Sequence, residues 1–336
     1  MWQIIESTGL VPLLQNSIKH GRLPNAYLLV GPAHIGKMTL ALNIAQALNC
    51  EAADRPCGSC MSCSRIAAGK HADIQIIGLA DGSTRENKSK EIGIEQIRDI
   101  QHSAALPPFE GKYKVFIIDG AEQLSNEAAN CLLKTLEEPA EKVIYLLLTV
   151  NEQAVLPTVI SRCQRLELNP MPAAAIEKSL LEHRHVEPEK AILLARLSHG
   201  CPGWAINATE DEAILEERSE RLEKIRGVMR SGFDERFAYA AQMATQFNQN
   251  RRTVQDELGL WLDWWHDLLL VKAGSADSIT NVDFTNDLIK MAENYDISQI
   301  RVFISRLQET AGQLQMNASP RLVLEVLMLN IPGRNV

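Results

Sequence analysis

A glycine-rich run that could bind a phosphate group follows an early apolar segment of the chain. Residues 26–30 read Ala-Tyr-Leu-Leu-Val and residues 31–39 read Gly-Pro-Ala-His-Ile-Gly-Lys-Met-Thr. Gly31, Gly36 and Lys37 match the pattern G-x-x-x-x-G-K, in which backbone N–H groups and a helix N-terminus hold the phosphates while the lysine adds positive charge. The sequence therefore predicts a phosphate-binding loop between a strand and a helix.

The residue after the lysine departs from that pattern. An ATPase needs Ser or Thr at this position because the hydroxyl ligates Mg²⁺. Met38 stands there instead, and a thioether is a poor ligand for so hard a cation. Thr39 does not simply replace the hydroxyl, because one step along a helix rotates the side chain by about 100°. Whether ATP or ADP binds at Lys37 is left open.

A second acidic motif also departs from that of a working ATPase. Residues 114–118 read as a buried strand that ends in Asp119, the place for the carboxylate of a Mg²⁺ site. A glutamate that activates the attacking water would come next, but Gly120 stands there. Glu122 comes two residues later, where we expect the chain to have turned away from the phosphates. The two departures favour a catalytically deficient site, with a competent ATPase as the alternative. The residues that would remain for nucleotide binding are Gly31, Gly36, Lys37, Thr39 and Asp119.

Four of the seven cysteines form a cluster with the spacing of a metal site. They are Cys50, Cys57, Cys60 and Cys63. Four thiolates without histidine or carboxylate favour a closed, tetrahedral and structural Zn²⁺ site, and Gly58 allows the tight turn that lets the sulfurs converge. An iron–sulfur cluster and free thiols are the alternatives. Disulfides are less expected, because the N-terminus lacks the layout of an export signal.

Charge and hydropathy exclude several functional classes. The 336 residues carry a formal net charge of −8, which argues against a strongly basic surface for nucleic acid. No apolar run approaches the roughly 18 residues of a membrane span. We therefore expect a cytoplasmic protein with an ordinary globular composition.

Apolar runs and helical patterns alternate in the first half of the chain, as in an α/β domain with a mainly parallel sheet. The expected strands are 26–30, 74–79, 115–118, 143–149 and 164–167, and the clearest helical patterns are 39–48, 94–104 and 126–138. Residues 81–90 read as an exposed loop. From about residue 168 onward only helical patterns follow, with a first helical unit that ends near residues 204–209.

Two further motifs complete a resemblance to a known family. Residues 132–139 read Leu-Leu-Lys-Thr-Leu-Glu-Glu-Pro, and residues 161–163 read Ser-Arg-Cys. Together with the loop and the four-cysteine insert, they resemble bacterial clamp-loader subunits of the AAA+ type, which belong to the DNA polymerase III holoenzyme. In the second half of the chain the resemblance is limited to residues 198–204 and 317–329.

The resemblance implies a fold and a set of partners. The fold would be a P-loop AAA+ α/β domain with a mainly parallel sheet and a zinc-binding insert, followed by a small helical lid and an all-helical collar. The expected boundaries are 1–167 (with the zinc module at 50–63), 168–209 and 210–336. The expected partners are the gamma/tau and delta subunits in a hetero-oligomeric ring. The sliding clamp and primer–template DNA would be reached through the assembled complex.

The family has zinc-bearing members of two types, which these motifs distinguish. The ATP-hydrolysing gamma/tau type would carry Gly-Lys-Thr in its loop, Asp-Glu in its second motif and an arginine after a later glycine. This chain has Met38, Gly120 and Trp204 at those places. All three departures point to the type that does not hydrolyse ATP, and a hydrolysis-competent subunit of the gamma/tau type is the alternative. The chain is not expected to polymerise DNA.

The resemblance also assigns a role to Arg162. In this family the arginine of Ser-Arg-Cys projects toward the nucleotide held by a neighbouring ATPase, and such a finger is worth roughly 10³–10⁵ in rate in other NTPases. The alternative is an arginine that pairs with a carboxylate at a domain boundary. Thr149 and Asn151 resemble the polar position that senses phosphate in active relatives, or else they cap a turn.

A group of apolar residues at helical spacing lies in the C-terminal region. Its members are Leu258, Trp261, Trp265, Leu268 and Leu269. Base stacking by the tryptophans is conceivable, but packing between helices is favoured. By the resemblance, this region and the helical pattern at 322–329 belong to the collar.

Overall fold

The computed structural model describes residues 2, 4, 9–79, 91–316 and 318–333. The loop expected at residues 81–90 lies outside them. The chain forms two compact units: the residues up to Pro172 with His199–Trp204, and Ala173–Ser198 with the residues from Ala205 onward.

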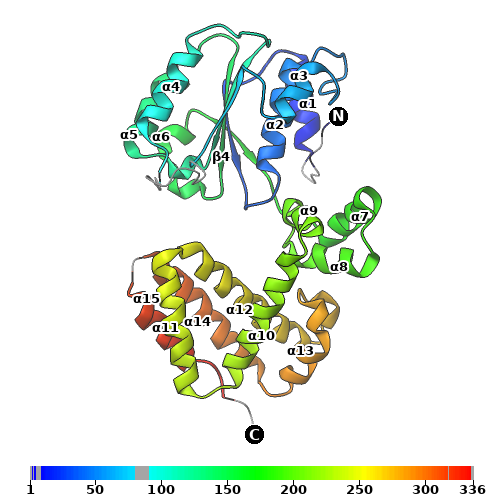
Figure 1. The fold of residues 1–336 in the computed structure, drawn as a ribbon, viewed down its shortest axis with the longest axis vertical. Coiled ribbons are helices and arrows are strands. Elements are labelled where there is room, and N and C mark those ends of the chain that lie inside the picture. The colour runs from blue at the N-terminus through cyan, green and yellow to red at the C-terminus, as the bar shows by residue number, and fades with distance from the viewer. Residues whose placement is uncertain (1, 3, 5–8, 80–90, 317, 334–336) are drawn as a thin grey trace. The chain divides into compact units, whose positions relative to one another are not determined.

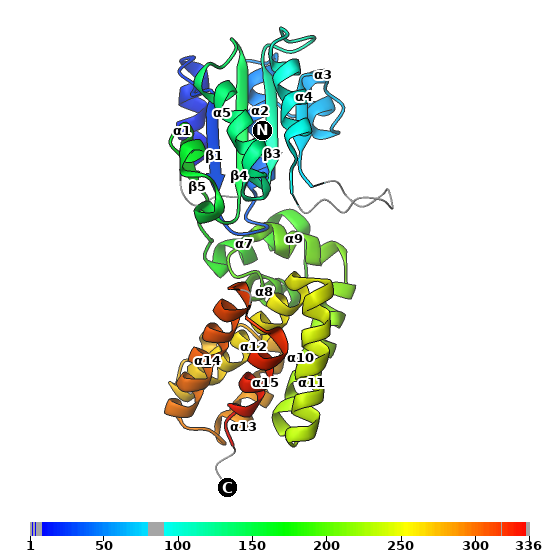
Figure 2. The same cartoon turned by 90° about the vertical axis from the view of Figure 1, so that its left-hand side faces the viewer.

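The first unit is built on a five-stranded parallel sheet. Its strands are β1 (Ala26–Val30), β2 (Ile74–Ile77), β3 (Lys114–Asp119), β4 (Val143–Thr149) and β5 (Gln164–Glu167). They lie in the order β2-β3-β4-β1-β5, and every neighbouring pair is parallel (Figure 2). The five predicted strands are confirmed, although β2 ends two residues early and β3 is one residue longer at each end.

The register of the sheet determines which loops share an edge. Val30 pairs with Thr149 on one side and with Glu167 on the other, and Asp119 pairs with Leu148. The residues that follow β1, β3 and β4 therefore meet at the carboxyl edge, where open α/β sheets bind ligands. The residues that precede β4 and β5 lie at the opposite, amino edge.

Helices cover both faces of this sheet (Figure 1). On one face lie α1 (Leu10–Lys19), α2 (Lys37–Asn49) and α3 (Met61–Ala67), and on the other lie α4 (Ile94–Ala104), α5 (Asn126–Glu137) and α6 (Pro157–Ile160). Every residue of β4 is buried, because a parallel sheet covered on both sides has no wet face. Ser125 caps α5 by accepting a bond from the Ala128 N–H at 3.1 Å.

The second unit is helical throughout its described residues. Its helices are α7 (Ala173–Arg184), α8 (Pro188–Leu197), most of α9 (Pro202–Glu210), α10 (Ala213–Arg230), α11 (Phe233–Gln249), α12 (Arg251–Lys272), α13 (Thr285–Ala292), α14 (Ile297–Gln315) and α15 (Pro320–Leu329), with the short 3₁₀ turns η3 (Ala276–Ser278) and η4 (Val282–Phe284). The helices predicted as lid and those predicted as collar fall in this one unit. The division of the chain into three domains stays a prediction.

The tryptophans of α12 form the centre of the helical core. Trp261, Trp264 and Trp265 are fully buried. The Trp265 ring lies 4.6 Å from the Phe303 ring and 5.1 Å from the Tyr295 ring, measured between centroids. Core packing is confirmed over base stacking, and Trp264 is a member of this core that the spacing did not reveal.

No described helix has the length and apolarity needed to cross a bilayer.

Candidate nucleotide site, metal centre and arginine finger

The predicted phosphate-binding loop joins β1 to α2 at the carboxyl edge of the sheet. Gly36 precedes the helix with φ of 104°, a conformation that favours glycine. A Cβ on Gly31 would lie 2.6 Å from the Leu168 carbonyl oxygen, so the loop also needs glycine for space. Lys37 is buried, and its Nζ donates to the carbonyl oxygens of Gly31 and Pro32, at 2.7 Å each. A phosphate would have to draw the ammonium away from these two bonds.

Asp119 lies within electrostatic reach of Lys37, as the sequence predicts. Burial lowers the pKa of Lys37, and the charge of Asp119 opposes this effect. Burial likewise raises the pKa of Asp119, and Lys37 counteracts it. The two motifs therefore form one site.

The expectation that Glu122 turns away from this site is wrong. The charge of Glu122 raises the pKa of both Lys37 and Asp119, and its Oε2 is buried without a hydrogen-bond partner in the described structure. The cause is the turn: Gly120 adopts φ of 87°, and the 3₁₀ helix η1 (Ala121–Gln123) follows at once. Glu122 therefore lies in a tight turn directly after the strand that ends at Asp119.

Apolar side chains stand at two of the three positions where this chain departs from a working ATPase. Met38 and Trp204 both pack, partly buried, against the apolar cluster under α2. The Gly203 N–H donates to the His34 carbonyl at 2.9 Å, and a Cβ on Gly203 would lie 2.6 Å from that oxygen. The segment around Gly203 therefore closes on the phosphate-binding loop without bringing a cation to it. Thr39 is half-buried one step further along α2.

Thr149 and Asn151 have local hydrogen-bond partners. Thr149 Oγ1 accepts from the Asn151 N–H, and Asn151 Oδ1 accepts from the Gln153 N–H, both at 3.1 Å. The Asn151 bond caps the 3₁₀ helix η2 (Glu152–Ala154), and the Thr149 bond fixes the turn that leads into it. The turn-capping alternative is confirmed.

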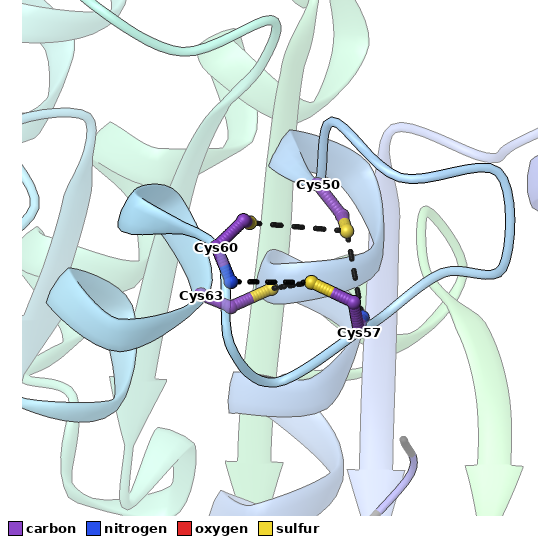
Figure 3. Close-up of side chains that lie close together, drawn as sticks. All are labelled: Cys50, Cys57, Cys60 and Cys63. Carbon is purple, nitrogen blue, oxygen red and sulfur yellow. Dashed lines mark hydrogen bonds between the residues drawn. The ribbon is translucent and has the colours of Figure 1, made fainter.

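The four clustered cysteines converge on one point between α2 and α3 (Figure 3). All four Sγ atoms lie within 4.8 Å of one another, and the Cys57–Cys63 and Cys60–Cys50 pairs are 4.0 Å apart. Tetrahedral ligands about 2.3 Å from a zinc ion are separated by about 3.8 Å. A disulfide would need about 2.05 Å, and the four thiols are free. The spacing fits a single ion better than a cluster of several irons, which would hold the thiolates further apart.

Backbone N–H groups point at these sulfurs. Cys57 N donates to Cys50 Sγ at 3.4 Å, and Cys60 N donates to Cys57 Sγ at 3.3 Å. Bonds from the Cys60 and Ser59 N–H groups lower the pKa of Cys57 to about 6, whereas burial raises the pKa of Cys63. The N–H groups favour thiolate, the form that binds metal.

Side chains outside the cysteine module fix it to the rest of the unit. Gln46 of α2 donates to the Cys63 carbonyl and the Lys112 ammonium donates to the Cys50 carbonyl, both at 3.0 Å. Asn49 Oδ1 accepts from the N–H groups of Lys112 and Tyr113 at 2.7 and 2.9 Å. The end of α2 is therefore tied to the segment that leads into β3.

Arg162 lies on the turn between α6 and β5. Its Nη1 donates to the Thr158 carbonyl at 2.9 Å and to Ser161 Oγ at 3.3 Å, while its Nη2 donates to the Glu137 carboxylate. The Arg162 side chain is 34% exposed. Arg162 thus pairs with a carboxylate, which was the alternative to the arginine-finger role, and its side chain still reaches solvent. Sequence reasoning missed Glu137, although the motif at 132–139 contains it.

The sheet separates Arg162 from the phosphate-binding loop of its own chain. Arg162 comes just before β5 and the loop comes just after β1, and these two strands are parallel neighbours. The arginine is therefore at the amino edge, and the loop is at the carboxyl edge. Arg162 and the phosphate-binding loop of the same chain therefore lie at opposite edges of the sheet.

Comparison with known proteins gives the family. The profile described as "DNA polymerase III, delta subunit" matches residues 7–172, and that described as "DNA polymerase III, delta subunit, C terminal" matches residues 215–332. The chain is 30% identical to DNA polymerase III subunit delta' of Bacillus subtilis over 94% of its own length and 93% of the relative's. It is 31% identical to the subunit delta' of Pseudomonas aeruginosa over 90% and 84%.

Other similarities are weaker. The chain is 26% identical to DNA polymerase III subunit tau of Bacillus subtilis over 98% of its length, and it spans 60% of that protein. A solved gamma-subunit-related protein of Thermotoga maritima has a TM-score of 0.42 and 17% identity, covering 95% of this chain and 97% of its own.

The fold and the phosphate-loop site define a P-loop α/β protein with an appended helical unit. Within that class, the chain belongs to the DNA polymerase III subunit delta' family. This is the type that the departures at Met38, Gly120 and Trp204 indicate.

Proposed function

We propose that this chain is the delta' subunit of the bacterial clamp loader and that it supplies Arg162 to the ATP site of a neighbouring gamma/tau subunit. The observation that carries the proposal is the position of Arg162 at the amino edge of the sheet. The phosphate-binding loop of the same chain lies at the opposite, carboxyl edge. A guanidinium there can stabilise charge only on a phosphate held by another molecule. Its partners would be gamma/tau and delta, with the sliding clamp and primer–template DNA reached through the complex.

The chain's own nucleotide site would be a remnant in this proposal. Gly31, Gly36, Lys37, Thr39 and Asp119 keep the outline of the site, while Met38 and Gly120 remove the metal-binding hydroxyl and the adjacent base. Zinc held by the four cysteines would be a structural ion that fixes the loop between α2 and α3. It would take no part in the reaction.

Arg162→Ala in a reconstituted loader tests the proposal. We expect DNA-stimulated ATP turnover to fall by at least roughly 10²-fold at the site next to this chain, with loader assembly unchanged. Arg165→Ala is a matched control, because Arg165 lies three residues further on and pairs with Glu152 and Glu167 at the surface. Wild-type turnover and clamp loading by the Arg162 variant would mean that Arg162 is no finger.

The second candidate is a hydrolysis-competent subunit of the gamma/tau type, favoured by the similarity to tau along nearly the whole chain. Steady ATP turnover by the purified chain, abolished in Lys37→Ala, would establish that alternative. Absence of turnover by the chain alone agrees with the delta' role.

A further inference from the structure

The motif Leu-Glu-Glu-Pro at residues 136–139 has no role in the function proposed above. The structure places it at the end of α5, which stops at Glu137 two residues before Pro139. This end precedes β4 and therefore lies at the amino edge of the sheet, as Arg162 does. Glu137 is the acid that contacts the guanidinium, and its side chain is 49% exposed.

The three groups that hold Arg162 are not equivalent. Thr158 and Ser161 belong to the turn that carries the arginine, so their bonds move with it. Glu137 comes from a different helix, 25 residues earlier in the chain. Among these three, Glu137 alone fixes the guanidinium relative to the body of the α/β unit.

The bonds to these groups leave part of the guanidinium available. An arginine has five N–H donors, and the bonds to Thr158, Ser161 and Glu137 use three of them. The remaining donors can meet phosphate oxygens without loss of the contacts that orient the side chain. The Arg162–Glu137 ion pair is half-exposed and therefore weak. It limits the directions that the Arg162 side chain can take, but the guanidinium can still interact with a phosphate.

We infer that Glu137 is a positioning residue for Arg162. It holds the guanidinium in the direction from which its free donors reach the phosphate of the neighbouring subunit. The inference rests on the arginine-finger role proposed above. Because transition-state contacts are sensitive to small displacements, removal of Glu137 should affect turnover more than nucleotide binding.

The experiment measures ATP turnover by the reconstituted loader with Glu137→Ala in this chain. We expect kcat to fall roughly 3- to 10-fold, with the KM for ATP unchanged within about twofold. Glu137→Gln keeps an oxygen that can accept from Nη2, so its loss should be smaller. Glu138→Ala is the matched control: Glu138 is the adjacent exposed acid, and its side chain makes no hydrogen bond or ion pair among the described residues.

A combined variant separates positioning from a general structural effect. If Glu137 acts through Arg162, Glu137→Ala should cause no further loss in a chain that already carries Arg162→Ala. Thermal unfolding of the Glu137→Ala chain should match wild type. A further loss in the double variant, wild-type kcat in the single variant, or faster turnover without Glu137 would each overturn the inference. In those cases an impaired Arg162→Ala variant leaves the finger role standing, whereas wild-type turnover in Arg162→Ala removes both.

Discussion

Lys37 and Met38 are neighbours at the start of α2, but they face different surroundings. The Lys37 ammonium is bonded to two carbonyls of its own loop, and Met38 contacts the apolar cluster under the helix. A phosphate could still exchange for the carbonyls around Lys37. A hydrated Mg²⁺ ion would find no hydroxyl at Met38.

Nucleotide binding by the isolated chain should therefore be weak and indifferent to Mg²⁺. We expect ATP affinity measured by calorimetry to change by less than about threefold when Mg²⁺ is replaced by a chelator. Lys37→Ala should abolish the remaining binding, and Met38→Thr should restore a dependence on Mg²⁺. A gain of tenfold or more with Mg²⁺ in the wild-type chain, about 1.4 kcal/mol, would contradict the argument.

Some of these residue positions can be read from the sequence, and others cannot. The pattern from Gly31 to Lys37 specifies a backbone shape, so the loop and its departure at Met38 are visible without a structure. The position of Glu122 depends on the left-handed conformation of Gly120, which glycine permits but does not require. The pairing of Glu137 with Arg162 joins two turns that no periodicity relates.

At the scale of elements, the parallel sheet was predictable because strands buried on both faces read as continuous apolar runs. β4 is such a run and its bounds were predicted to the residue, whereas β2 lies at the edge of the sheet and is half exposed, so its end was misplaced. The order of the strands follows from long-range packing and was not predicted. The convergence of the cysteines was predicted, since all four lie within one short segment.

Zinc should be the element that holds this segment folded. The purified chain should contain about one zinc ion, because four thiolates make one closed site. Cys60→Ser should lose it and unfold at a lower temperature, because structural zinc sites contribute directly to folding. Cys131→Ser is a control that should keep full zinc content, since Cys131 donates to Gln101 on the other face of the sheet. Iron in place of zinc, or unchanged zinc in Cys60→Ser, would refute the assignment.

At the scale of the whole molecule, α15 has two apolar faces. One is buried in the core of the helical unit and consists of Val323, Leu324, Leu327 and Met328. The other is an exposed stripe of Leu322, Val326 and Leu329, in which Leu322 is 62% exposed. The resemblance places the helical pattern at 322–329 in a collar, but the sequence could not show which of its apolar residues stay exposed.

Under the proposed function, the α15 stripe should contact another subunit of the ring. Val326→Asp should weaken association with gamma/tau roughly 10-fold or more, as expected for a buried interface residue, without a change in the unfolding temperature of the free chain. Val302→Asp serves as the control, because Val302 is an exposed valine on α14 (59% exposed, against 48% for Val326). Equal association of wild type and the Val326 variant in sedimentation would place the interface elsewhere.

The opposite placement of Arg162 and the phosphate-binding loop gives the α/β unit a direction. Under the proposed function, one edge of the sheet contributes to a neighbour's reaction, and the other edge receives a contribution only if its own site is competent. A head-to-tail series of such units is heterologous, so each contact joins unlike surfaces. A subunit that supplies an arginine to its neighbour but has no competent ATP site of its own belongs at an end of the series. The loss of one hydroxyl at Met38 would then set where a row of ATP sites stops.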